Sequence, residues 1–125
     1  MEKKKTILIA EDNEDLARTL QDRLESVGYK TLIAQEGVRV IELAHKEKPD
    51  LIVLDLRMPA GSGQNTLHSL RSQGETREIP VIIVTGLTDL GLEDEAFDAG
   101  ANDFFRKPYD EQELLKSIRR LLGES

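Results

Sequence analysis

The sequence predicts an α/β fold: a doubly wound parallel sheet with helices on both faces. Short apolar runs alternate with helix-period patterns along the whole chain of 125 residues. Three of these runs, residues 7–10, 51–54 and 81–84, are continuously apolar, as parallel strands covered on both faces are. Because helical patterns separate the strands, we expect right-handed crossovers and a single open sheet.

Two weaker strands complete the predicted sheet. Residues 29–34 contain Lys30 and Thr31, which place this strand nearer the edge of the sheet. Residues 103–106 form a fifth, short strand. The expected topology is therefore five strands, each followed by a helix.

The helical segments differ in how clearly they are patterned. The first has an apolar face at helical spacing, marked by Leu16, Leu20, Leu24 and Val27, and Gly28 ends it as a C-cap. Apolar faces also mark the second, third and fifth helices: Val38, Ile41 and Ala44; Leu67 and Leu70; and Leu114, Leu115, Ile118, Leu121 and Leu122. The fourth helix, residues 92–99, is short and acidic and lies among glycines.

The bulk composition limits the classes of function. The length predicts one domain over residues 1–125. A formal net charge of -7 disfavours direct binding to nucleic acid or to anionic membranes. The absence of cysteine excludes disulfides, thiolate catalysis and thiolate metal sites. No apolar stretch approaches the roughly 20 residues of a transmembrane helix, so we expect no membrane insertion and a cytoplasmic location.

Five polar residues come where predicted strands end: Glu11, Asp12, Asp55, Thr85 and Lys107. In an open α/β sheet, ligands bind just outside the carboxyl ends of the strands. Carboxylates bind divalent metals such as Mg²⁺, and an ammonium pairs with phosphate. The set predicts phosphoryl transfer onto a carboxylate. Asp55 is the expected nucleophile, and Glu11 and Asp12 would supply the metal that neutralises the incoming oxygens.

Each of these features alone also has an ordinary structural explanation. The acidic segment 11–15 suits the start of a helix, and Asp55 suits a cap before a turn rich in proline and glycine. Thr85 suits a β-branched strand residue, and Lys107 suits a solvated surface. The sequence leaves open whether the bond from Lys107 to Pro108 is cis. The prediction therefore rests on the constellation.

Together, these motifs closely resemble the receiver domain of two-component response regulators. The resemblance covers essentially the whole chain and is carried, in order, by Glu11-Asp12, Asp55 with Met58-Pro59 and Gly63, Thr85-Gly86, and Lys107-Pro108. Any one motif is weak, but all of them in register are specific. The resemblance implies a flavodoxin-like sheet with the strand order 2-1-3-4-5.

The resemblance also implies roles for the acidic residues. Asp55 matches the phosphoacceptor, and Glu11 and Asp12 match the acidic pair that binds Mg²⁺ directly or through water. Arg57 would contribute its backbone carbonyl to the metal. A phosphohistidine on a sensor histidine kinase or a histidine phosphotransfer protein would donate the phosphoryl group in line. The implied protein assists its own phosphorylation and dephosphorylation and is not a turnover enzyme in the usual sense.

The remaining matched residues imply a conformational switch. Thr85 and Lys107 match the residues that contact the phosphoryl oxygens, and Phe104 matches the aromatic switch position. Movement of Thr85 toward the phosphoryl group would leave space into which Phe104 rotates. The fourth helix and its neighbours would then shift between two states and control a downstream protein or output domain. The sequence identifies neither this partner nor the cognate kinase.

Three positions depart from the common family pattern. Phe104 replaces a frequent tyrosine and lacks its hydroxyl, and Glu11 replaces a frequent aspartate. Leu87 stands two residues after the threonine. Leu87 and the Arg57 side chain are expected to flank the route by which water attacks the phosphoaspartate. We therefore expect slow autodephosphorylation.

Three alternatives compete with this interpretation. A phosphohydrolase of the haloacid-dehalogenase type needs a second aspartate two residues after the nucleophile, where this chain has Arg57. A flavin-binding flavodoxin needs a phosphate loop after the first strand, where Glu11 and Asp12 would repel phosphate. A receiver-like module that binds partners without phosphorylation is the alternative that we retain.

Overall fold

The computed structural model describes residues 4–58 and 63–124 and places five strands and five helices within them. The strands are β1 (Thr6–Ala10), β2 (Lys30–Ala34), β3 (Leu51–Leu54), β4 (Val81–Thr85) and β5 (Asp103–Arg106). The helices are α1 (Glu14–Ser26), α2 (Gly37–Glu47), α3 (Gly63–Ser72), α4 (Leu92–Asp98) and α5 (Glu111–Leu121). Strands and helices alternate as the sequence predicts. Pro59, part of the motif after Asp55, lies outside the described residues.

The strands form one parallel sheet in the order β2-β1-β3-β4-β5, which confirms the predicted doubly wound, flavodoxin-like fold. β2 lies at an edge, as Lys30 and Thr31 predict. β1 and β3 are neighbours, with Ala10 opposite Leu54. The strand order reverses at β1, because β2 lies on one side of it and β3 on the other. Such a reversal opens a crevice outside the carboxyl ends of the strands.

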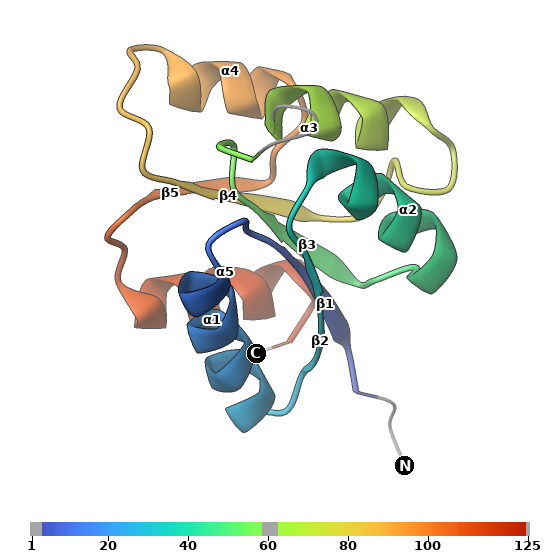
Figure 1. Cartoon of the computed structure of the whole chain (residues 1–125), viewed down its shortest axis with the longest axis vertical. Helices are drawn as coiled ribbons and strands as arrows, with labels where there is room; N and C mark the ends of the chain where they lie inside the picture. Colours follow the sequence, from blue (N-terminus) through green and yellow to red (C-terminus); the bar gives the residue numbers. More distant parts are fainter. Residues whose placement is uncertain (1–3, 59–62, 125) are drawn as a thin grey trace.

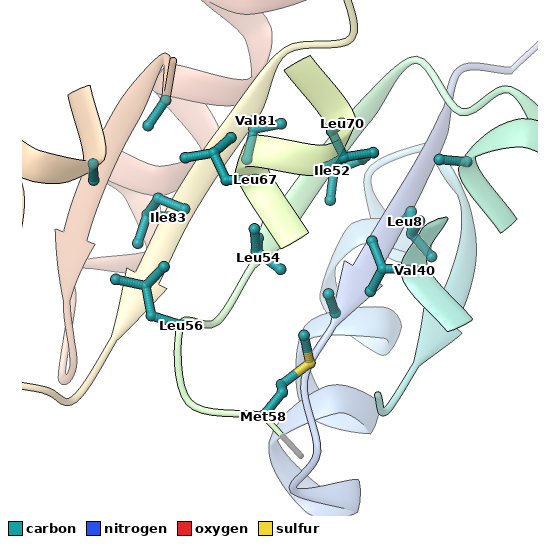
Figure 2. Packing of buried hydrophobic residues seen from close by; sticks show 14 of the residues in the cluster. Leu8, Val40, Ile52, Leu54, Leu56, Met58, Leu67, Leu70, Val81 and Ile83 are labelled. Carbon is teal, nitrogen blue, oxygen red and sulfur yellow. The ribbon is translucent and has the colours of Figure 1, made fainter. Parts of the chain in front are cut away.

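Helices cover both faces of the sheet. α1 and α5 lie on one face, and α2, α3 and α4 lie on the other (Figure 1). On the three-helix face, Leu8 and Ile52 of the sheet pack with Val40 of α2 and Leu70 of α3 (Figure 2). Burial of each such side chain contributes about 1.5–3 kcal/mol. The carboxyl ends of the strands thus lie between two layers of packed helices.

Three apolar residues that the sequence assigned to buried helix faces are instead exposed. The exposed fractions are 47% for Leu16, 40% for Val27 and 61% for Val38. All three lie at or beside a helix end, where an apolar spacing along the sequence does not guarantee cover by the sheet. The buried faces of α1 and α2 consist of other residues: Ala17, Leu20, Leu24, Gly37, Val40, Leu43 and Ala44.

The ends of α1 show how the sequence positions the first loop. Asn13 is the N-cap, and its side chain accepts a hydrogen bond from the Leu16 N–H at 3.0 Å. At the other end Gly28 follows the C-cap residue Val27 with a φ of 103°, a left-handed conformation that glycine adopts without strain. Among the described residues, no helix has the length and apolar character needed to cross a bilayer.

Candidate functional site

The ends of β1 and β3 bring two carboxylates together. Glu11 follows β1 and Asp55 follows β3, and the Asp55 N–H donates to the Ala10 carbonyl at 2.9 Å. Both acidic residues are buried, with 6% of Glu11 and 4% of Asp55 exposed. Buried charges are costly unless they are paired. Two carboxylates in this position therefore require a neighbouring cation.

Lys107 supplies that cation from the end of β5. Its Nζ donates to Asp55 Oδ2 at 2.8 Å and also to Glu11 Oε1. The Lys107 N–H donates to the Thr85 carbonyl at 2.8 Å, which fixes the backbone from which the side chain extends. The bond from Lys107 to Pro108 is cis. The ammonium thus bridges the two buried carboxylates across the end of the sheet.

Burial and charge have opposing effects on the bridging groups. Burial raises the pKa of Glu11 above its ordinary value, against the opposing effect of the hydrogen bond from Lys107. For Lys107, burial acts to lower the pKa, but the hydrogen bonds and charges of Asp55 and Glu11 outweigh it and leave the pKa raised. Lys107 is therefore a permanent positive charge at neutral pH.

Asp12 adds a third carboxylate to the site. Oxygen atoms of Glu11, Asp12 and Asp55 all lie within 4.8 Å of one another. Asp12 is exposed, so the group opens to solvent on one side. Carboxylate oxygens are hard ligands, and Mg²⁺ is commonly bound by one or two carboxylates together with waters. The donor set therefore fits Mg²⁺.

The turn that follows Asp55 is held close to its carboxylate. The Arg57 N–H donates to Asp55 Oδ1 at 2.9 Å, while Oδ2 faces Lys107. Gly63, the first residue of α3, donates its N–H to the Leu56 carbonyl at 3.0 Å. A Cβ on Gly63 would lie 2.3 Å from the Leu56 Cα and 2.8 Å from the Asp55 carbonyl oxygen. The absent side chain of Gly63 thus lets α3 begin against the Asp55 turn.

Thr85 ends β4, between the strands that lead to Asp55 and Lys107. Its side chain is buried, and its Oγ1 accepts a hydrogen bond from the Leu87 N–H at 3.2 Å. Because this bond uses a lone pair, the hydroxyl hydrogen stays available to donate. Thr85 is therefore placed in the same edge of the sheet as the acidic residues, as the sequence predicts.

Phe104 is 9% exposed and packs in the core cluster that contains Leu92 and Ala96 of α4. Arg106 covers this ring, with its guanidinium carbon 5.2 Å from the ring centroid, and donates a hydrogen bond to the Leu87 carbonyl. No role of Arg106 is predicted from the sequence. The sequence nevertheless places Arg106 on the strand face that carries Phe104, because strand residues two apart point to the same face.

A pocket of about 460 Å³ opens beside Glu11 and Lys107. Leu16 and Leu20 of α1 and Tyr109 after β5 contribute much of its apolar wall. The exposed Leu16 therefore lines a hollow next to the acidic group. Glu11, Lys107 and Glu111 are the charged residues of a wall that is otherwise largely apolar.

The fold and the carboxylates at its edge agree with a comparison against known families. The profile of the response regulator receiver domain matches residues 7–119. The chain therefore belongs to the response regulator receiver family. This membership supports a function as a phosphorylation-type signalling switch.

Individual relatives agree with this assignment. The chain is 32% identical to the polar-differentiation response regulator DivK of Brucella anthropi, over 97% of this chain and 98% of that protein. It is 36% identical to the probable transcriptional regulator ycf27 of Galdieria sulphuraria, over 98% of this chain but only 47% of that protein. The chain thus spans about half the length of the second relative.

A solved structure extends the comparison to three dimensions. The receiver domain of sensor histidine kinase PA1611 from Pseudomonas aeruginosa superimposes with a TM-score of 0.88 at 28% identity. The alignment covers 98% of this chain and all of that domain. That structure has a magnesium ion coordinated in its active site cleft.

Proposed function

We propose that this protein is a signalling switch that accepts a phosphoryl group on Asp55 in the presence of Mg²⁺. The observation that carries the proposal is the bridge from Lys107 to two buried carboxylates, Asp55 and Glu11, at the carboxyl edge of the sheet. A buried carboxylate with a fixed ammonium on one side and oxygen ligands on the other suits the attack on a phosphorus atom.

Glu11, Asp12 and Asp55 would hold the metal, with the Arg57 backbone carbonyl as a further ligand. Bound Mg²⁺ supplies positive charge that offsets the charge of the transferred phosphoryl oxygens. The fit rests on the three carboxylates within 4.8 Å of one another and on the open side at Asp12. Receiver relatives support the same assignment, since one of them holds magnesium in its cleft.

The residues of this chain then act by position and charge. A carboxylate oxygen of Asp55 attacks the phosphorus of a phosphohistidine on a sensor kinase or phosphotransfer protein. The phosphorus–nitrogen bond breaks, and the electron pair returns to the imidazole. Lys107 pairs with the transferred oxygens, and the free hydroxyl hydrogen of Thr85 donates to one of them. Most of the rate enhancement of phosphoryl transfer then comes from positioning and electrostatics.

The acyl phosphate on Asp55 would act as a signal rather than as a step of turnover. We propose that the chain works as one receiver domain and is not a turnover enzyme in the usual sense. Movement of Thr85 toward the phosphoryl group alters the space beside Phe104 and shifts α4. The changed surface would then be read by a downstream protein or output domain.

The proposal is tested by the intact mass of the protein after incubation with Mg²⁺ and acetyl phosphate. We expect one phosphoryl group on the wild type and none on Asp55→Asn under the same conditions. Omission of Mg²⁺ should also prevent the addition. If the wild type binds Mg²⁺ but gains no mass, and gains none from histidine kinases either, the chain is a receiver-like module that works without phosphorylation.

A further inference from the structure

Four residues at the ends of β4 and β5 form a continuous set of contacts. The Leu87 N–H donates to the Thr85 hydroxyl, and the Leu87 carbonyl accepts from the Arg106 guanidinium. The same guanidinium lies over the ring of Phe104. Thr85 and Arg106 are themselves register partners in the pair of strands β4 and β5. Leu87 is thus held at both its N–H and its carbonyl.

The position of Arg106 explains why its side chain reaches both the Leu87 carbonyl and the Phe104 ring. Phe104 and Arg106 are separated by one residue in β5, so both side chains leave the same face of the strand. Leu87 packs against the core cluster that contains Phe104. A planar guanidinium can stack on an aromatic ring while its edge donates to a carbonyl. A lysine ammonium, as a point charge, lacks this combined geometry.

We propose that Arg106 is a positioning residue that couples the turn after Thr85 to the ring of Phe104. With Arg106 in place, the Leu87 carbonyl and the Phe104 ring share one partner, so neither changes position without affecting the other. The consequence for signalling rests on the proposed function, because it requires Thr85 to respond to a phosphoryl group. The coupling itself is a property of the unphosphorylated protein.

The coupling is tested on the full unphosphorylated chain with fluorine-labelled phenylalanine and with amide hydrogen exchange. The Phe104 resonance is assigned with Phe104→Leu, and the exchange rate of the Leu87 amide is measured by NMR. Arg106→Ala and Arg106→Gln remove the guanidinium, and Arg106→Lys retains the charge on a similar stem. Arg120→Ala is the matched control, since Arg120 pairs with Asp103 at the other end of the same strand.

In Arg106→Ala and Arg106→Gln, we expect the Leu87 amide to exchange about three to ten times faster, as the loss of one exposed cation contact and hydrogen bond implies. The Phe104 resonance should move toward its value in the unfolded chain in the same variants. Arg106→Lys should recover part of both changes, and Arg120→Ala should cause neither.

The proposal is overturned if both arginine variants leave the Leu87 amide and the Phe104 resonance unchanged, or if only one of the two responds. Should Arg106→Ala fail to fold, Arg106→Gln decides between the outcomes. No step of this test requires phosphorylation. A protein that never accepts a phosphoryl group can therefore still show the coupling, and a phosphorylated protein can still lack it.

Discussion

Replacement of Lys107 with methionine removes the ammonium between Asp55 and Glu11 but keeps a long apolar stem. The side chain of Lys107 is 23% exposed, whereas the side chains of Asp55 and Glu11 are 5% and 8% exposed. Each charge-assisted hydrogen bond is worth about 1.5–3 kcal/mol. Partial exposure of Lys107 reduces the total. We therefore expect Lys107→Met to lower the free energy of unfolding by about 2–4 kcal/mol at pH 8.

The loss should depend on pH in a defined direction. Burial already raises the pKa of Glu11, and removal of the ammonium raises it further. An acid with a raised pKa in the folded state binds its proton more tightly there, so stability falls as pH rises through that interval. The difference between wild type and Lys107→Met should therefore be smaller at pH 5 than at pH 8.

Urea unfolding at the two pH values measures this difference, with Lys116→Met as the matched control. Lys116 is 72% exposed and pairs with Glu113 at 3.8 Å, so its replacement should change stability by no more than about 0.5 kcal/mol. Addition of Mg²⁺ should narrow the gap for Lys107→Met, because the metal replaces the missing positive charge. Equal, pH-independent losses of stability in both variants would show that the bridge from Lys107 to the buried carboxylates contributes no more than a surface ion pair.

Four further substitutions test other regions of the protein. Gly63→Ala should cost about 1–3 kcal/mol and slow phosphorylation, because its Cβ would meet the chain beside Asp55 at 2.3 Å; unfolding and intact-mass time courses identical to wild type would contradict this. Leu87→Glu and Arg57→Asn should each shorten the lifetime of the phosphorylated protein by about threefold or more, and unchanged decay in both would remove the idea that this pair hinders water. Burial raises the pKa of Tyr29 to about 12, so the folded state keeps a proton that the unfolded chain loses near pH 10. Between about pH 10 and pH 12 the wild type should then lose about 1–2 kcal/mol more stability than Tyr29→Phe does; an equal loss in the two proteins would argue against this effect of Tyr29.

The alternation of strands and helices and most of the site were predictable from local features of the sequence, whereas the strand order followed only from the resemblance to receiver domains. Continuous apolar runs mark β1, β3 and β4, and the polar residues that follow each run converge because parallel strands end at one edge. The positions of Glu11 and Asp55 after two of these runs, and of Lys107 after the shorter strand 103–106, were therefore enough to group the three residues. The bridge made by the Lys107 ammonium, by contrast, depends on the distance spanned across the sheet and on side-chain conformation.

Other features required the tertiary structure. Leu16 and Val38 have the spacing of buried residues but are exposed, whereas their neighbours Ala17 and Gly37 are buried. The role of Gly63 follows from its approach to Leu56, which no local pattern encodes. Arg106 shares a strand face with Phe104, yet its hydrogen bond to Leu87 depends on the turn after β4.

Borohydride reduction of the phosphorylated protein, followed by peptide mapping, identifies the residue that accepts the phosphoryl group. An acyl phosphate on aspartate is reduced to homoserine, so the modified residue is identified by mass. We predict homoserine at position 55 in the wild type and an unmodified residue in Asp55→Asn. Modification at Glu11 or Asp12, or a phosphoryl group that resists this chemistry because it is held on a histidine, would contradict the assignment of Asp55 as the acceptor.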